Sequence, residues 1–346
     1  MLNRWSAVVV AVTLVGLLAG GVLWWKIADT TEFEQAVGLA PSGADRLAWT
    51  DWRAVRSELG ADLSASSSSD QVDEFLAEGF DADLTSTSAL LASAPVLHER
   101  FGFSPASVEW ELFSQSAEGA LVTLRLPEST DFDELADGLE EFGYTRPDDE
   151  DGVWRGGSDL LAGIGPDLTP ELQHIALDPE ERLVRTSDTA DYLATALEDT
   201  GEQDEAVDQV VEASGEPLSA AVYAGPQACR ELAMSSDDPA DQTLADQLVE
   251  DAGEVNPLTA FAMSAQPGGV RVVLAFEDDD QARTNADSRA VLARGPAPGQ
   301  GGEFADRFRV GQVTAQGDLV TMELEPVEGQ FVLSDLSSGP VLFATC

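Results

Sequence analysis

Residues 108–126 read VEWELFSQSAEGALVTLRL, and this stretch gives the clearest indication of the fold. Apolar residues alternate with Glu109 and Glu111 in its first part, and they alternate with polar residues again from Val122 onwards. Alternation with a period of two is typical of a strand that is buried on one face. Because Gly119 lies between the two parts in a short turn, the stretch predicts an antiparallel hairpin of half-buried strands.

A second hairpin and helix repeat this order in the other half of the chain. After the first hairpin, Asp131 is a suitable cap for a helix that runs to Gly143. The stretch from Leu258 to Glu277 has the same alternating pattern, and Asp278 opens a helix at a similar distance behind it. This recurrence predicts an α+β fold of two related units, each a mostly antiparallel sheet with helices on one face.

A long uncharged stretch lies near the beginning of the sequence. No charge occurs from Trp5 to Trp25, between Arg4 and Lys26. As a helix this stretch would reach about 31 Å, and the hydrocarbon core of a bilayer is about 30 Å thick. Trp5, Trp24 and Trp25 fall where tryptophans favour the membrane interface. We therefore expect a single transmembrane anchor, with Arg4, Trp5, Trp24, Trp25 and Lys26 at its interfaces.

A cleaved signal peptide and a buried core helix are alternative interpretations of this stretch, whereas lipid attachment is excluded. A cleaved signal peptide usually has a shorter apolar region of about 7–15 residues that ends in small residues, whereas this one ends in bulky ones. A buried core helix is the second alternative. Lipid attachment after Leu18-Ala19-Gly20 is excluded because the next residue is Gly21, not cysteine.

The orientation and the domain boundaries follow from the anchor. A tail of four residues has no fold to retain, so we place the short amino-terminal end in the cytoplasm and the large body outside the cell membrane. The predicted divisions are a transmembrane anchor at 1–26, a stalk at 27–44, a first α+β unit at 45–200, an acidic helical joint at 201–216 and a second α+β unit at 217–346.

Composition limits the partners and the chemistry. The chain has 64 acidic residues against 18 lysines and arginines, a net charge of −46, and Lys26 is its single lysine. Nucleic-acid binding needs a basic surface, so we expect none. A phosphate-binding loop and a pyridoxal Schiff base both need a lysine in the body, so no cofactor is expected. The acidic surface favours solubility or adaptation to salt over specific cation binding.

The two cysteines predict one disulfide, between Cys229 and Cys346. Disulfides form and persist in the oxidising environment outside the cytoplasm, where we place both residues. A reactive thiol is the alternative, but no histidine lies near either cysteine in the sequence.

No catalytic, cofactor-binding or metal-ligating residue can be assigned. His98 and His174 are the only histidines, and both fit surface or capping positions better than a Ser-His-Asp site. A carboxylate pair for glycoside cleavage cannot be chosen among so many acids without geometry. The acidic runs at 148–151, 237–238 and 277–280 fit solvated turns and helix starts better than calcium sites.

The arrangement of the chain resembles a class of uncharacterised, membrane-anchored extracytoplasmic bacterial proteins of actinobacterial type. The resemblance lies in the anchor and in the strand and helix that follow Pro41 and end at Gly60. It implies a location and no activity. We therefore expect a non-catalytic binding or cell-envelope role, with an envelope protein or polymer as partner and no small-molecule ligand assigned. The alternatives are an envelope hydrolase that uses two carboxylates and a weak cation-dependent adhesion module.

Overall fold

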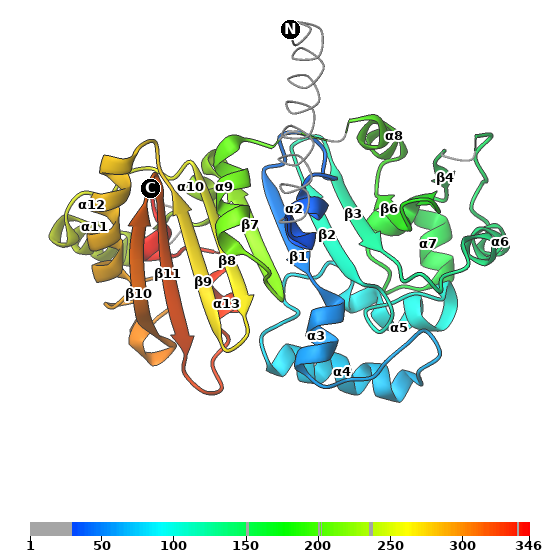
Figure 1. The fold of residues 1–346 in the computed structure, drawn as a ribbon, viewed down its shortest axis with the longest axis horizontal. Coiled ribbons are helices and arrows are strands. Elements are labelled where there is room, and N and C mark those ends of the chain that lie inside the picture. Colours follow the sequence, from blue (N-terminus) through cyan, green and yellow to red (C-terminus); the bar gives the residue numbers. More distant parts are fainter. Residues whose placement is uncertain (1–29, 150–151, 200, 202, 235–237, 338) are drawn as a thin grey trace, which may run out of the picture.

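The protein is described from a computed structural model that covers residues 30–149, 152–199, 201, 203–234, 238–337 and 339–346 (Figure 1). The expected anchor, Trp5–Trp25, lies outside these residues, as do Arg4 and Lys26. Within the described part of the chain, no helix is both long enough and apolar enough to cross a membrane.

One antiparallel sheet runs through both halves of the chain. Within the described residues it has eleven strands, in the order β10-β11-β9-β8-β7-β1-β2-β3-β6-β5-β4. The strands are β1 (Arg46–Thr50), β2 (Trp110–Gln115), β3 (Ala120–Arg125), β4 (Trp154–Arg155), β5 (His174–Asp178), β6 (Leu183–Ser187), β7 (Ser219–Ala224), β8 (Ala260–Gln266), β9 (Gly269–Ala275), β10 (Phe308–Gln316) and β11 (Leu319–Pro326). The α+β class and the antiparallel sheet are confirmed, and the hairpin predicted from residues 108–126 is β2 paired with β3.

The sheet is continuous because β1 and β7 pair at its middle. Their antiparallel register runs from Arg46 opposite Tyr223 to Thr50 opposite Ser219. Outwards from this pair the order is β1-β2-β3-β6-β5-β4 on one side and β7-β8-β9-β11-β10 on the other. The strands of both expected units therefore share one sheet instead of forming two.

Helices lie on both faces of this sheet, whereas the sequence predicted one face. They are α2 (Glu32–Val37), α3 (Trp52–Glu58), α4 (Ser69–Asp81), α5 (Ala94–Val96), α6 (Phe132–Phe142), α7 (Ser158–Ile164), α8 (Ala190–Glu198), α9 (Glu205–Ser214), α10 (Gly225–Glu231), α11 (Pro239–Ala252), α12 (Asp279–Leu292) and α13 (Val332–Leu336). Shorter helical turns are η1 (Leu91–Ser93), η2 (Leu97–Phe101), η3 (Pro170–Gln173), η5 (Phe304–Asp306) and η6 (Leu342–Ala344). In Figure 1, α11 and α12 lie at one end of the molecule, while α6 and α7 lie at the other.

Side-chain alternation on the central strands separates the two cores. Trp49 of β1 packs in one core with Phe33 of α2 and Val210 of α9. Tyr223 of β7 faces the opposite, larger core with Trp52 of α3. The segments expected to form a stalk and a joint thus contain α2 and α9, which cover the first of these faces.

Both strands of the hairpin, β2 and β3, are buried on both faces, whereas the sequence predicted burial on one. Glu111 of β2 is only 1% exposed and lies beneath the chain that follows α4. Its carboxylate accepts hydrogen bonds from Trp52 Nε1 (3.0 Å), the Ser88 hydroxyl (2.7 Å) and the Ala89 backbone N–H (2.6 Å). Burial is the largest effect on Glu111 and raises the pKa of its carboxyl group.

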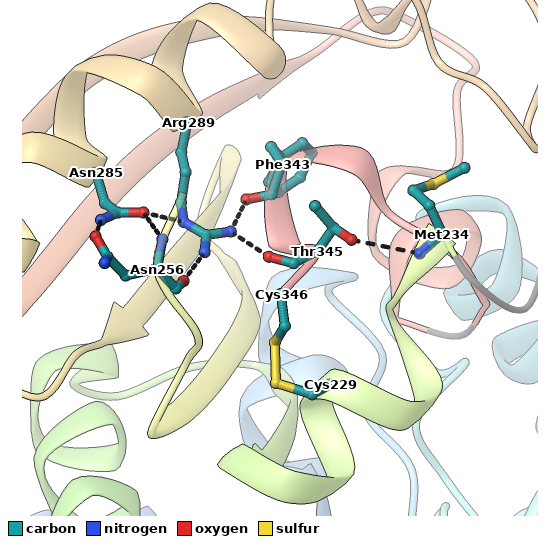
Figure 2. The surroundings of a disulfide bond; sticks show 8 residues. All are labelled: Cys229, Met234, Asn256, Asn285, Arg289, Phe343, Thr345 and Cys346. Atoms are coloured by element: carbon teal, nitrogen blue, oxygen red, sulfur yellow. Dashed lines mark hydrogen bonds between the residues drawn. A yellow bond between two sulfur atoms is a disulfide. The ribbon is translucent and has the colours of Figure 1, made fainter. Parts of the chain in front are cut away.

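The predicted disulfide between Cys229 and Cys346 is present and fastens the last residues to α10 (Figure 2). Arg289 of α12 points toward the same segment and is fully buried. Its Nη1 donates to the carbonyl oxygens of Phe343 (2.8 Å) and Thr345 (2.9 Å). Burial lowers the pKa of Arg289 to about 9. A covalent bond and a buried guanidinium together hold the end of the chain.

Candidate ligand-binding groove

A groove of about 860 Å³ opens beside α6, on the sheet face that carries the larger core. Its floor is formed by β5 and β6, one wall by α6, and the other wall by residues 100–103 and 63–65. Ligand pockets in proteins commonly measure about 300–1,000 Å³, so the groove has room for a small molecule.

Apolar side chains form the floor and part of both walls. The buried ones are Phe101, Phe103, Leu139, Ile175, Leu177 and Val184. Leu63, Leu135 and Phe142 also line the groove but are only half-buried, so their apolar surface is in contact with water. A ligand that covers this surface gains about 25 cal/mol for each Å² of apolar area that it removes from water.

The wall formed by α6 follows from its local sequence. The Asp131 carboxylate accepts hydrogen bonds from the backbone N–H groups of Asp133 (3.0 Å) and Glu134 (3.2 Å), which caps the beginning of the helix. Gly143 ends the helix in a left-handed conformation with φ of 101°. Between these ends, the apolar residues recur at helical spacing and face the sheet.

Gly138 is a position without a side chain where α6 lines the groove. It lies in the middle of the helix and lines the groove, and a Cβ added there would meet nothing within 4 Å. Its backbone is in the ordinary helical range, so no turn or strain requires a glycine at this position. Since glycine weakens a helix interior by about 0.5–1 kcal/mol relative to alanine, Gly138 keeps space at a cost in stability.

Two arginines belong to the walls. Nη1 of Arg56 donates to the carbonyl oxygens of Pro105 (2.7 Å) and Val108 (2.9 Å), and burial lowers the pKa of Arg56 to about 10. Nη1 of Arg100 donates to the carbonyl oxygen of Ile164 (2.5 Å). Both guanidinium groups therefore hold neighbouring backbone in place.

His98 positions the loop at one end of the groove. One ring nitrogen, Nε2, lies 2.7 Å from the carbonyl oxygen of Ser67, and the other, Nδ1, lies 3.1 Å from the hydroxyl of Ser104. The ring thus joins the serine loop after α3 to the segment after η2. His98 has a structural role here, in line with the capping or surface position expected for it.

The other residues considered in the sequence lie apart from the groove. His174 begins β5, and burial, followed by the nearby charge of Arg155, lowers the pKa of its imidazole. Asp238 and Asp278 cap α11 and α12. Parts of the acidic runs at 148–151 and 237–238 lie outside the described residues. Among the residues that are described, no group of three or more His, Cys, Asp or Glu side chains gathers as a metal site would require.

The sequence did not reveal the groove residues as a site. The periodicity of Leu135, Leu139 and Phe142 indicates a helix that packs on a sheet, which is a core pattern. The one local signal was Gly138, a helix-weakening residue in the middle of this pattern.

Comparison with known proteins gives no family for this chain. No family model matches the sequence, and no curated protein matches it. Among solved structures, three crystal forms of TP0453 share 10% sequence identity with the chain, with TM-scores of 0.40 to 0.42. The matches cover 87% of this chain and 96% or 97% of the TP0453 chains. A likeness at this level carries no argument about function.

Proposed function

We propose that this protein is a membrane-anchored extracytoplasmic binding protein, without catalysis of its own, whose groove beside α6 takes the apolar part of a small ligand. One observation carries the proposal. The groove is bordered by half-buried Leu63, Leu135 and Phe142 over a floor of buried apolar residues. Wet apolar surface in a concave site is what an apolar ligand covers.

The location rests on the sequence. The uncharged stretch Trp5–Trp25 supports an anchor in the cell membrane, and the disulfide between Cys229 and Cys346 fits an oxidising compartment. The resemblance to membrane-anchored extracytoplasmic bacterial proteins agrees with this location.

A division into two related units is part of the same proposal. The order of a helix, a strand, further helices, a hairpin, a helix and a second hairpin recurs from α2 to β6 and from α9 to β11, with β4 and α7 inserted before the second hairpin of the first run. The symmetric strand order on either side of the β1–β7 pair supports this view. The groove lies in the first unit, so the second unit would have diverged in this region.

A hydrolase with two carboxylates finds less support in this groove. The acids that line it, Asp131, Glu134, Asp137 and Glu141, are all exposed. A general acid needs a raised pKa, which burial provides. Burial raises the pKa of Asp51, Asp83 and Glu111, and none of these three lines the groove.

The test is photo-crosslinking of the full chain in nanodiscs of zwitterionic lipid. The probe is a dodecyl maltoside analogue with a diazirine in its alkyl chain, and peptide mapping locates the labelled residues. We expect labels in 131–142 and 100–103. Unlabelled octyl, decyl and dodecyl maltosides should compete with increasing strength, by up to about fourfold for each CH₂ group at equal free concentration.

Two tryptophan variants make the test specific to the groove. Gly138→Trp places an indole where space is open, so labelling of α6 should fall strongly. Gly163→Trp is the matched control, since Gly163 is also helical, exposed and open around its Cβ position but does not line the groove. Equal labelling in Gly138→Trp and the unaltered chain would refute binding in the groove.

A further inference from the structure

The groove carries more negative than positive charge along its border. Among the residues that line it, four carboxylates stand against two guanidinium groups, and all four belong to α6 or its cap. They are exposed at the opening, where a bound ligand would place its water-facing end. The whole chain adds a net charge of −46, so an anionic headgroup is repelled both locally and at a distance.

The two arginines do not reverse this balance. Arg56 already donates to two carbonyl oxygens, and Arg100 donates to Ile164 while its guanidinium lies 5.1 Å from the centre of the Phe142 ring. Their hydrogen bonds run to backbone oxygens of the walls and not to a carboxylate. These hydrogen bonds occupy Nη1 of each guanidinium, so part of the donor capacity of both arginines is already used.

An aromatic cluster at the same place favours a cation. The ring of Phe142 lies 4.8 Å from that of Phe101, which in turn is 6.0 Å from Phe103. Phe142 already has a cation over its face, the guanidinium of Arg100. Aromatic faces attract quaternary ammonium groups in the same way. The rings can tolerate a cation beside them, and the four carboxylates on the border decide the sign of the headgroup.

We propose that the ligand of the groove is a single-chain amphiphile with a cationic headgroup. Its hydrocarbon chain lies against Leu135, Leu139 and the floor of the groove, and its head lies beside Glu134 and Glu141. The inference rests on the proposed function, because it names the class of ligand for the same groove.

The test compares three competitors that share one chain and differ in the charge of the head: dodecyltrimethylammonium, dodecyl maltoside and dodecyl sulfate. Each displaces the neutral photo-crosslinking probe from the full chain in zwitterionic nanodiscs, below micelle-forming concentrations and with the free concentration measured. Dodecyltrimethylammonium should compete about three- to tenfold more strongly than the maltoside, and dodecyl sulfate more weakly. The preference should shrink as salt is added, because screening weakens exposed charges.

A pair of double variants separates the groove from the general charge of the protein. Glu134→Gln with Glu141→Gln neutralises two carboxylates that line the groove. Asp133→Asn with Glu140→Gln neutralises two exposed carboxylates of the same helix that do not line it. Only the first pair should abolish the preference for the ammonium compound. Unchanged competition by dodecyl maltoside shows that each variant is folded with its groove intact.

The experiment separates a wrong headgroup from a wrong binding function. If the neutral probe does not label the groove, the binding function itself is wrong. If it labels the groove but dodecyl sulfate competes as well as the ammonium compound, only the cationic headgroup is refuted. An equal loss of preference in both double variants would also refute it, because the effect would then come from overall charge.

Discussion

Asp83, just after α4, accepts a hydrogen bond from the backbone N–H of Leu333, which lies 250 residues further along the chain. The same carboxylate accepts from the N–H of Ser334 (3.0 Å) and so occupies the first turn of α13. The ring of Phe80 lies 5.4 Å from that of Phe331 beside this contact. The two halves of the chain are thus joined a second time, away from the β1–β7 pair.

Replacing Asp83 should weaken this junction. Asp83→Asn keeps the left-handed backbone that Asp83 adopts, with φ of 58°, because asparagine tolerates that conformation. Its amide nitrogen cannot accept a hydrogen bond, so one of the two backbone donors loses its partner. We expect the free energy of unfolding to fall by about 1–3 kcal/mol in urea denaturation. Asp81→Asn, at the exposed end of α4, is the control and should change it by less than about 0.5 kcal/mol.

Ionisation of Glu111 should make the stability depend on pH. Because burial raises the pKa of Glu111 in the folded protein, its contribution to stability is complete below the pKa of the unfolded chain, about 4.3. That contribution is lost as the pH rises through the folded pKa. The free energy of unfolding of Glu111→Gln minus that of the unaltered protein should therefore increase from about pH 4 upwards. A difference that stays constant with pH would contradict this expectation, whatever the offset between the two proteins.

Loss of the disulfide should destabilise the protein strongly. Cys229 and Cys346 are 117 residues apart, and in the chain-entropy model a loop of this length contributes about 4–5 kcal/mol. The Cys229→Ser, Cys346→Ser protein should unfold at correspondingly lower denaturant concentration. Added reductant should bring the unaltered protein to the same midpoint and leave the double variant unchanged.

Arg289 should stabilise the same segment by a separate mechanism. Arg289→Met removes the donors to Phe343 and Thr345 and leaves buried carbonyl oxygens without partners, at about 1–3 kcal/mol each. With the disulfide intact, hydrogen exchange should quicken at residues 341–346. If the amides of this segment keep their protection, the disulfide alone orders it.

Replacing Gly138 with alanine should stabilise the protein and leave the groove open. Alanine fits at this position without contact, so Gly138→Ala should raise the free energy of unfolding by about 0.5–1 kcal/mol. A methyl group fills little of the groove, and labelling by the neutral probe should persist. Thermal unfolding measures the gain. A lower melting temperature than that of the unaltered protein would show that Gly138 has a packing role.

Patterns that act over short distances predicted the local elements of this fold. The hairpin, the helix capped by Asp131 and the disulfide follow from alternation, capping and compartment, and all three are in the structure. The pairing of β1 with β7 joins residues far apart in the chain, so no local sequence pattern indicates it. For the same reason, the sequence could not show that α2 and α9 cover a second face.

The burial of Glu111 shows how period-two alternation misleads. A glutamate between apolar residues indicates a solvent-facing position when one face of the sheet is open. Here the segment from Thr85 to Ser93 crosses over that position and supplies hydrogen-bond donors from Ser88 and Ala89. The sequence could not predict the groove for a related reason, since its walls come from three separate segments and its floor from two strands, which only the fold brings together.

The position of β1 has a mechanical consequence. The first strand of the described residues, β1, is not at a border of the sheet but at its centre, with five residues matched to β2 and five to β7. A force applied to the chain before residue 30 would pass through α2 into β1. Because β1 is hydrogen-bonded to both β2 and β7, both strand pairs would bear this force. Both halves of the sheet should therefore resist such a force together.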